Sequence, residues 1–130
     1  PPVPIYRGKN PLREPGGVWV VVEGEKCVDA VRACGFRAAC SIGGASNAAA
    51  GDWSPLHGGK VLILPDNDDA GRAYAAEVRN LLDGKAETVV VSPPVGPKGD
   101  IADLVADAGA ERVATYLTLV AARIYKRGNG

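Results

Sequence analysis

Short apolar runs alternate with longer amphipathic segments along most of this chain. Most of the runs are rich in Val, Ile and Leu and lack alternating polar positions, which is typical of strands buried on both faces of a sheet. They predict strands at 18–22, 36–42, 60–65 and 86–92. Strands of this kind occur mainly in parallel sheets that are covered by helices.

The segments that follow these runs carry apolar residues at helical spacing. After the first run, Cys27, Val31 and Cys34 recur at intervals typical of one helix face, and Gly35 ends the pattern. The same spacing predicts further helices at 68–84, 101–109 and 110–127. The apolar faces of the second and the last helix are predicted to contain Ala70, Tyr74, Val78 and Leu81, and Val113, Leu117, Val120 and Ile124, respectively.

Strands that alternate with helices indicate an α/β fold. We predict a Rossmann-like, four-stranded and mainly parallel sheet with helices on both faces. The chain of 130 residues is long enough for one domain with its own core. The expected divisions are an extended arm or linker at 1–17, the domain at 18–108, an amphipathic helix packing on the domain at 109–127, and a tail at 128–130.

Acidic residues follow the predicted strands at the edge where such sheets bind ligands. Glu23 follows the first strand, Asp66 and Asp68 follow the third, and Asp100 lies in the loop after the fourth. In an extended segment, residues i and i+2 point the same way, so Asp66 and Asp68 are expected to face one point while Asn67 faces elsewhere.

Gathering these acids has an energetic cost that a cation would reverse. Two carboxylates about 4 Å apart repel by roughly 1 kcal/mol in water and about 4 kcal/mol in a partly buried cleft. Oxygen ligands with no nearby Cys or His favour Mg²⁺ or Mn²⁺ over zinc. Individually, however, Asp68 or Asp69 could cap the helix that follows, Asp100 could cap the next helix, and Glu23 could be an ordinary loop acid.

The same residues carry a resemblance to a known family. The segments "VVEGEKCVDAV", "LPDNDDAGR" and "KGDIADLV" look like the Toprim domain of topoisomerases and primases, over roughly residues 18–108. The hallmarks of that family are a Glu-Gly pair after the first strand and Asp-x-Asp after the third, present here as Glu23-Gly24 and Asp66-Asn67-Asp68. The form "PDNDDAGR" resembles phage, plasmid and bacterial primases and primase-helicases most. Many such relatives have an acid where Cys27 stands.

The resemblance implies a Toprim fold and the Mg²⁺-dependent synthesis of RNA primers, with Mn²⁺ able to substitute. It implies that Asp66 and Asp68 hold the metal, that Asp100 is a further acidic ligand, and that Glu23 is either a ligand or the base for the attacking 3′-hydroxyl. The implied partners are a single-stranded DNA template and nucleoside triphosphates. They would be bound by a larger replication protein with zinc-binding and helicase domains, so the isolated domain is expected to be weakly active or inactive.

Three basic residues near the acids are weaker candidates for contacts with nucleotide phosphates. Lys26 begins the first predicted helix, Arg72 lies in the first turn of the helix after the aspartates, and Lys98 precedes Asp100. Each has an ordinary alternative, since Lys26 and Lys98 could be solvated and Arg72 could balance Asp69.

Composition limits the broad class of protein. Fifteen basic and fifteen acidic residues cancel, so no overall field draws the protein to nucleic acid or membranes, although a metal can supply local positive charge. No apolar run approaches the roughly 20 residues of a membrane span. The three cysteines, Cys27, Cys34 and Cys40, lack metal-binding spacing and are interpreted as small core residues of a cytoplasmic protein.

Three other functions fit part of the pattern. A Toprim nuclease would use the same acids, and a non-catalytic Toprim module would serve only in assembly. A receiver-like signalling domain also gathers acids at strand ends, but it needs a fifth strand and a lysine and a hydroxyl placed after the fourth. Ser92 could supply that hydroxyl, whereas Lys98 is badly placed.

Overall fold

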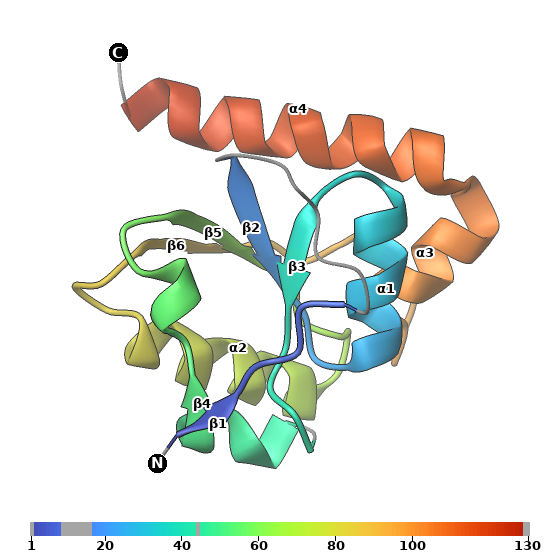
Figure 1. Ribbon diagram of the computed structural model, residues 1–130. Coiled ribbons are helices and arrows are strands. Elements are labelled where there is room, and N and C mark those ends of the chain that lie inside the picture. Colours follow the sequence, from blue (N-terminus) through green and yellow to red (C-terminus); the bar gives the residue numbers. More distant parts are fainter. Residues whose placement is uncertain (1, 9–16, 44, 129–130) are drawn as a thin grey trace.

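The computed structural model describes residues 2–8, 17–43 and 45–128. Its centre is a parallel sheet with the strand order β3-β2-β5-β6 (Figure 1). The strands are β2 (Val18–Val21), β3 (Arg37–Ala39), β5 (Lys60–Ile63) and β6 (Glu87–Val90). The prediction of an α/β fold with a four-stranded parallel sheet is therefore confirmed.

Helices cover both faces of this sheet, as the sequence predicts. The helices are α1 (Glu25–Ala33), α2 (Asp69–Leu81), α3 (Ile101–Ala108) and α4 (Ala110–Gly128). Alternate residues of β2 separate two apolar clusters: Val21 packs with side chains of α2, and Val20 packs with side chains of α1 and α4. Because both faces of the central strands β2 and β5 are buried, these strands need no polar alternation, whereas the edge strand β6 is partly exposed.

The register of α2 differs from the prediction at its first turn. The buried residues are Gly71, Tyr74, Ala75 and Val78, whereas Ala70 is exposed. The prediction for Ala70 was wrong because α2 places Gly71, rather than the preceding alanine, against the backbone of Asp66. The other expected face residue, Leu81, is partly buried and packs against the same apolar cluster.

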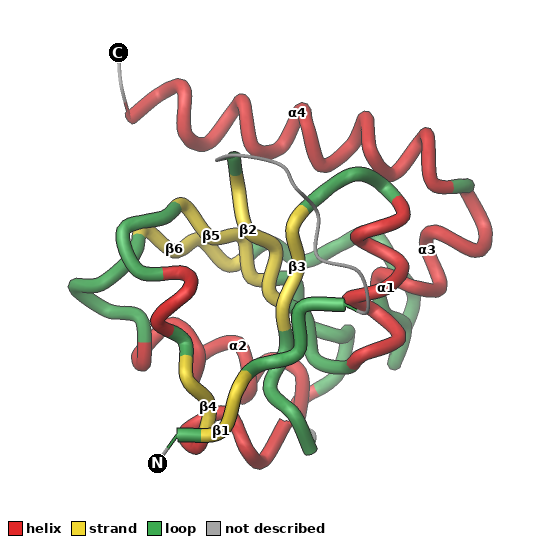
Figure 2. The backbone as a smooth tube through the Cα atoms, in the orientation of Figure 1, coloured by secondary structure: helices red, strands yellow, loops and turns green. Residues whose placement is uncertain are grey.

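The described part of the proline-rich segment is extended and lies against the domain (Figure 2). There β1 (Val3–Pro4) pairs in parallel with β4 (Gly51–Asp52), and Ile5 is buried in the core. The Tyr6 backbone bridges Cys40. The rest of the expected arm, 1 and 9–16, lies outside the described residues.

Two short 3₁₀ helices, η1 (Ala45–Ala50) and η2 (Ser54–Leu56), flank β4 and lead to β5. They occupy the small, polar stretch between the second and third predicted strands. The helices η1 and α2 pack together on one face of the sheet, where Tyr74 is buried.

Helix α4 crosses the molecule at the end of the sheet where the strands begin (Figure 1). Val113 and Leu117 are buried, while Val120 and Ile124 are partly exposed. Near the end of the helix, the Tyr125 hydroxyl donates a hydrogen bond to the Val61 carbonyl at 3.0 Å. In the described parts of the chain, no helix combines the length and apolarity that crossing a membrane requires.

Candidate metal centre at the carboxyl edge of the sheet

The strand order places a topological switch point between the ends of β2 and β5, the position where folds of this kind have a crevice. From β2 the chain passes through α1 to β3 on one side, and from β5 it passes through α2 to β6 on the other. Connections that leave neighbouring strands in opposite directions open a ligand site at their carboxyl ends. Glu23 lies just beyond β2, and Asp66 lies just beyond β5. The topology thus brings these two acids to one place.

The Glu23 and Asp66 carboxyl groups are in contact. The pKa of Asp66 is raised from 3.8 to about 7, first by burial, then by the carboxyl contact with Glu23 and by the charges of Glu23, Asp100 and Asp68. The Glu23 Oε2 atom is buried, and the described residues offer it no N–H or hydroxyl donor. A proton shared with Asp66, or a cation, would satisfy this oxygen.

Asp100 lies near Glu23 and Asp66 because the loop between β6 and α3 is held beside them by hydrogen bonds from Asn67. The side-chain amide of Asn67 donates to the Val95 carbonyl at 3.1 Å, and the Asn67 backbone N–H donates to the Gly99 carbonyl at 2.8 Å. Asn67 thus fastens this loop beside the aspartates. One ligand atom each from Cys27, Asp66 and Asp100 lie within 4.8 Å of one another, which is close enough to share an ion.

Asp68 and Asp100 are also helix caps, the alternative that the sequence left open. Asp68 Oδ1 accepts a hydrogen bond from the Gly71 N–H at 2.6 Å. Asp100 and Asp103 form a reciprocal capping box, with both bonds at 2.9 Å. Each cap uses Oδ1, so Oδ2 takes no part in either cap; the Oδ2 atom of Asp100 lies 3.5 Å from Lys26 Nζ, which a metal ion at this position would have to displace. Capping and metal binding are therefore compatible at both positions.

Gly71 fixes the approach of α2 to the acidic crevice. A Cβ atom at this position would collide with the backbone nitrogen and carbonyl oxygen of Asp66. The first turn of α2 consequently rests directly on the backbone that carries Asp66. This contact explains why a glycine, which has no Cβ atom, stands at position 71.

The three predicted basic residues occupy different environments around this crevice. Lys26 Nζ lies 3.5 Å from Asp100 Oδ2 and is largely exposed; the charge of Asp100 raises the pKa of Lys26. Arg72 donates to Asp69 at 2.8 Å and to the Asn67 side chain at 3.3 Å, so it balances Asp69. Lys98 is exposed and has a positive φ of 61°.

Cys27 is the one member of the cluster that the sequence analysis assigned only to the core. It is 3% exposed, and burial is the first cause that raises the pKa of its thiol to about 12, followed among the raising influences by the charges of Asp100 and Asp66. The thiol is therefore neutral at physiological pH. Its position in the first turn of the helix that follows Glu23 was the available signal, because that turn begins at the acidic edge.

Comparison with known proteins returned no match to a family model, to a curated protein sequence or to a solved structure. The chemistry of the crevice must therefore be read from its own residues. Oxygen atoms of Glu23, Asp66 and Asp100 form a donor set that suits a hard divalent cation. The unpartnered Glu23 oxygen and the adjoining Asp66 carboxyl group fit such a cation, whereas Cys27 is a softer neighbour.

Proposed function

We propose that this chain is a Toprim-type catalytic domain of a DNA primase, which makes RNA primers on single-stranded DNA by Mg²⁺-dependent nucleotidyl transfer. The observation that carries the proposal is the convergence of Glu23, Asp66 and Asp100 from three separate loops on one crevice. The "EG" and "PDNDDAGR" motifs supply two of these loops. The fold brings three carboxyl groups from distant segments together and places only the Lys26 ammonium group beside them among the described residues. Such a cluster favours a metal-binding role over an ordinary group of solvated acids.

The residues divide into two roles. Asp66 and Asp100 would hold Mg²⁺ or Mn²⁺, with the Oδ2 atom of Asp68 as a further donor. The metal, when bound, neutralises charge on the triphosphate of the incoming nucleotide and orients it. Glu23 has a buried oxygen beside Asp66 and would accept the proton of the attacking 3′-hydroxyl or complete the ligand set.

The surroundings of the crevice support phosphate chemistry over signalling. Lys26 lies beside Asp100 with its ammonium group exposed, where it can reach a phosphate oxygen. Within the described residues, no strand follows β6 in the central sheet, although a receiver-like domain needs a fifth strand there. The single-stranded template and the remaining basic residues would belong to neighbouring parts of a larger replication protein.

Manganese titration tests the metal centre directly. Free Mn²⁺ is measured by electron paramagnetic resonance for the unaltered protein, Asp66→Asn and Asp69→Asn. Asp69 is the matched control because it is adjacent in sequence, fully exposed and paired with Arg72. We expect Asp66→Asn to weaken binding about tenfold or more and Asp69→Asn to leave it nearly unchanged. Equal effects of the two variants, or no binding by the unaltered protein, would contradict the proposal.

Nucleotide chemistry requires a second experiment. With Mn²⁺ present, we expect a nucleoside triphosphate to bind the unaltered protein more tightly than Asp66→Asn. A longer chain that adds the neighbouring segments should make primers from nucleoside triphosphates on single-stranded DNA, and Asp66→Asn should abolish this synthesis. Cleavage of the DNA without primer synthesis would instead identify a Toprim nuclease.

A further inference from the structure

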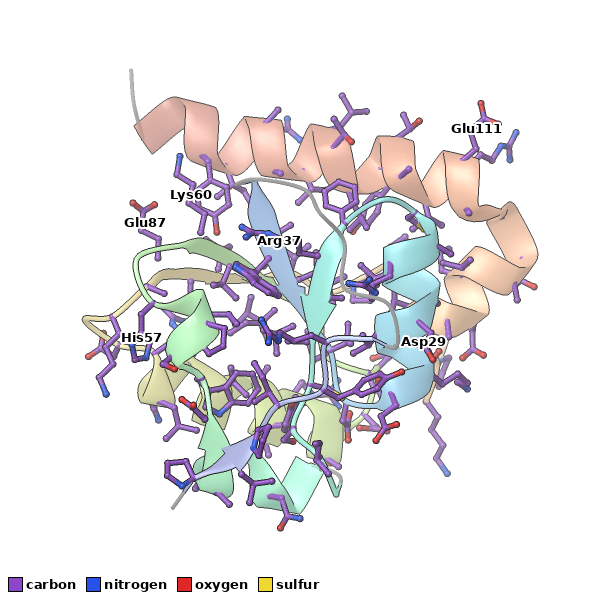
Figure 3. All side chains as sticks on the ribbon, in the orientation of Figure 1. Asp29, Arg37, His57, Lys60, Glu87 and Glu111 are labelled. Atoms are coloured by element: carbon purple, nitrogen blue, oxygen red, sulfur yellow. The ribbon has the colours of Figure 1, made fainter. Side chains whose placement is uncertain are left out.

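A hollow at the opposite edge of the sheet has no part in the proposed function. It has a volume of about 760 Å³ and lies where β2, β3 and β5 begin. Its walls combine Trp19, Arg37 and Lys60 from these strands with Tyr125 from α4. Arg37 and Lys60 both lie at this end of the sheet, beneath α4 (Figure 3). The volume falls within the range of small-molecule sites, about 300–1,000 Å³.

Within the described residues, Arg37 has no carboxylate partner in this hollow. Its guanidinium carbon lies 4.4 Å from the centre of the Trp19 ring, and Nη2 donates to the Gly17 carbonyl at 2.8 Å. The Nε atom is buried and has no acceptor among the described residues. Burial also lowers the pKa of Arg37. Among the described residues, no anion offsets the cost of desolvating this partly buried cation.

Lys60 provides a second positive charge in the same hollow. Its ammonium group lies 5.2 Å from the centre of the Tyr125 ring. Glu87 is its neighbour across β5 and β6, but the ion pairs found in the described part of the chain include neither Lys60 nor Arg37. None of the described lining residues is acidic. Two cations that form no ion pair with the described residues therefore share one concave surface.

We propose that this hollow binds a small molecule that carries a phosphate group. Arg37 and Lys60 supply charged N–H donors for the phosphate oxygens, and Val18, Pro55, Ala121 and Ala122 supply an apolar wall for the rest of the ligand. A nucleic-acid strand would require a row of cations along an extended groove, whereas this hollow concentrates two in a limited volume. The site is independent of the metal centre because it uses none of the acids.

The experiment uses inorganic phosphate and adenosine monophosphate as separate probes, with EDTA present and ionic strength held constant with chloride. Amide and indole shifts in ¹H–¹⁵N spectra report binding. We expect saturable shifts at the Trp19 indole, Gly58 and Ala121 with at least one probe. Tighter binding of adenosine monophosphate than of phosphate would show that the apolar wall contributes, and equal binding would restrict recognition to the phosphate. Absence of saturable shifts with both probes overturns the proposal.

Charge-removing variants locate the contact. We expect Lys60→Gln and Arg37→Gln each to weaken binding about tenfold, and Arg112→Gln, which removes an exposed charge outside the hollow, to leave binding unchanged. Because Arg37→Gln could disturb folding, Lys60→Gln decides the result if the spectrum of Arg37→Gln shows loss of structure. Equal weakening by Arg112→Gln and Lys60→Gln would show non-specific attraction and overturn the proposal. Asp66→Asn should bind both probes as tightly as the unaltered protein. A negative result for this hollow can therefore be told apart from a negative result for the proposed metal centre.

Discussion

The two edges of the central sheet have opposite electrostatic character. At the carboxyl edge, Glu23, Asp66 and Asp100 gather more negative charge than Lys26 balances. At the amino edge, Arg37 and Lys60 face a hollow whose described lining contains no acid. The same parallel strands support both arrangements, because all their carboxyl ends share one edge and all their amino ends share the other.

The direction of the helices helps to explain how several carboxylates can lie together at the carboxyl edge. Helices α1, α2 and α3 begin there, and Gly24, Asp68 and Asp100 are their N-caps. The positive ends of helix dipoles and the free N–H groups of the first turns stabilise nearby carboxylates. None of these three helices begins at the amino edge, so their N-termini do not act on the cations there. Its cations are instead stabilised by aromatic rings.

The strongest test of the acidic edge is the substitution Gly71→Ala. The new Cβ would collide with the Asp66 backbone, and neither α2 nor that loop can yield without moving the acids. We expect a loss of about 2–4 kcal/mol in the free energy of unfolding, measured by urea denaturation, together with weaker Mn²⁺ binding. Gly24→Ala is the matched control, since its Cβ would meet no atom within 4 Å and should cost less than about 1 kcal/mol.

A pH titration of stability in EDTA tests the Glu23–Asp66 pair. The Asp66 pKa is about 7 in the folded protein and 3.8 ordinarily, so between pH 4 and 7 the folded state binds more protons than the unfolded state. The free energy of unfolding should therefore fall as pH rises through this interval, by about 1–2 kcal/mol after allowance for solvent screening. Asp66→Asn should flatten the profile. A fall of the same size in Asp66→Asn would assign the dependence to other groups.

Cys27 offers a way to sharpen the metal preference of the same edge. Its thiol faces Asp66 and Asp100, where an added carboxylate would give a further oxygen ligand. We expect Cys27→Asp to tighten Mn²⁺ binding up to about tenfold, equivalent to about 1.4 kcal/mol, and to destabilise the metal-free protein by adding a buried acid. Isothermal titration of this variant beside Cys27→Ser, which keeps the size and adds no charge, separates these effects. Weaker Mn²⁺ binding by Cys27→Asp than by Cys27→Ser would show that Cys27 lies outside the ligand shell.

The acidic edge could be predicted from sequence because it is built from local signals. Apolar runs end at Glu23 and before Asp66, and the order of elements fixes which edge they share. Local spacing could not distinguish Ala70 from Gly71 as the buried position, because that choice depends on contact with the Asp66 backbone. It also could not separate a core cysteine from one beside the acids, since Cys27 is both.

The amino edge escaped prediction because no local motif describes it. Arg37, Lys60 and Tyr125 come from β3, β5 and α4, and each looks like an ordinary residue of its own element. His57 also lines the hollow although it is exposed and forms part of no motif. Only the crossing of α4 over the strand starts brings these side chains together, and that crossing is a property of tertiary packing.

The smallest expected effect concerns the attachment of α4 to the amino edge. Tyr125→Phe retains the ring beside Lys60 but removes the hydrogen bond from the hydroxyl to the Val61 carbonyl. We expect a loss of about 1 kcal/mol in the free energy of unfolding, the usual net value of one buried hydrogen bond, with Mn²⁺ binding unchanged. Hydrogen exchange should increase mainly at the end of α4. Tyr116→Phe is the control, because its hydroxyl forms no hydrogen bond recorded within the described residues. A change in Mn²⁺ affinity for Tyr125→Phe would show that the two edges are coupled, because the substituted ring lies at the opposite end of the strands from Asp66.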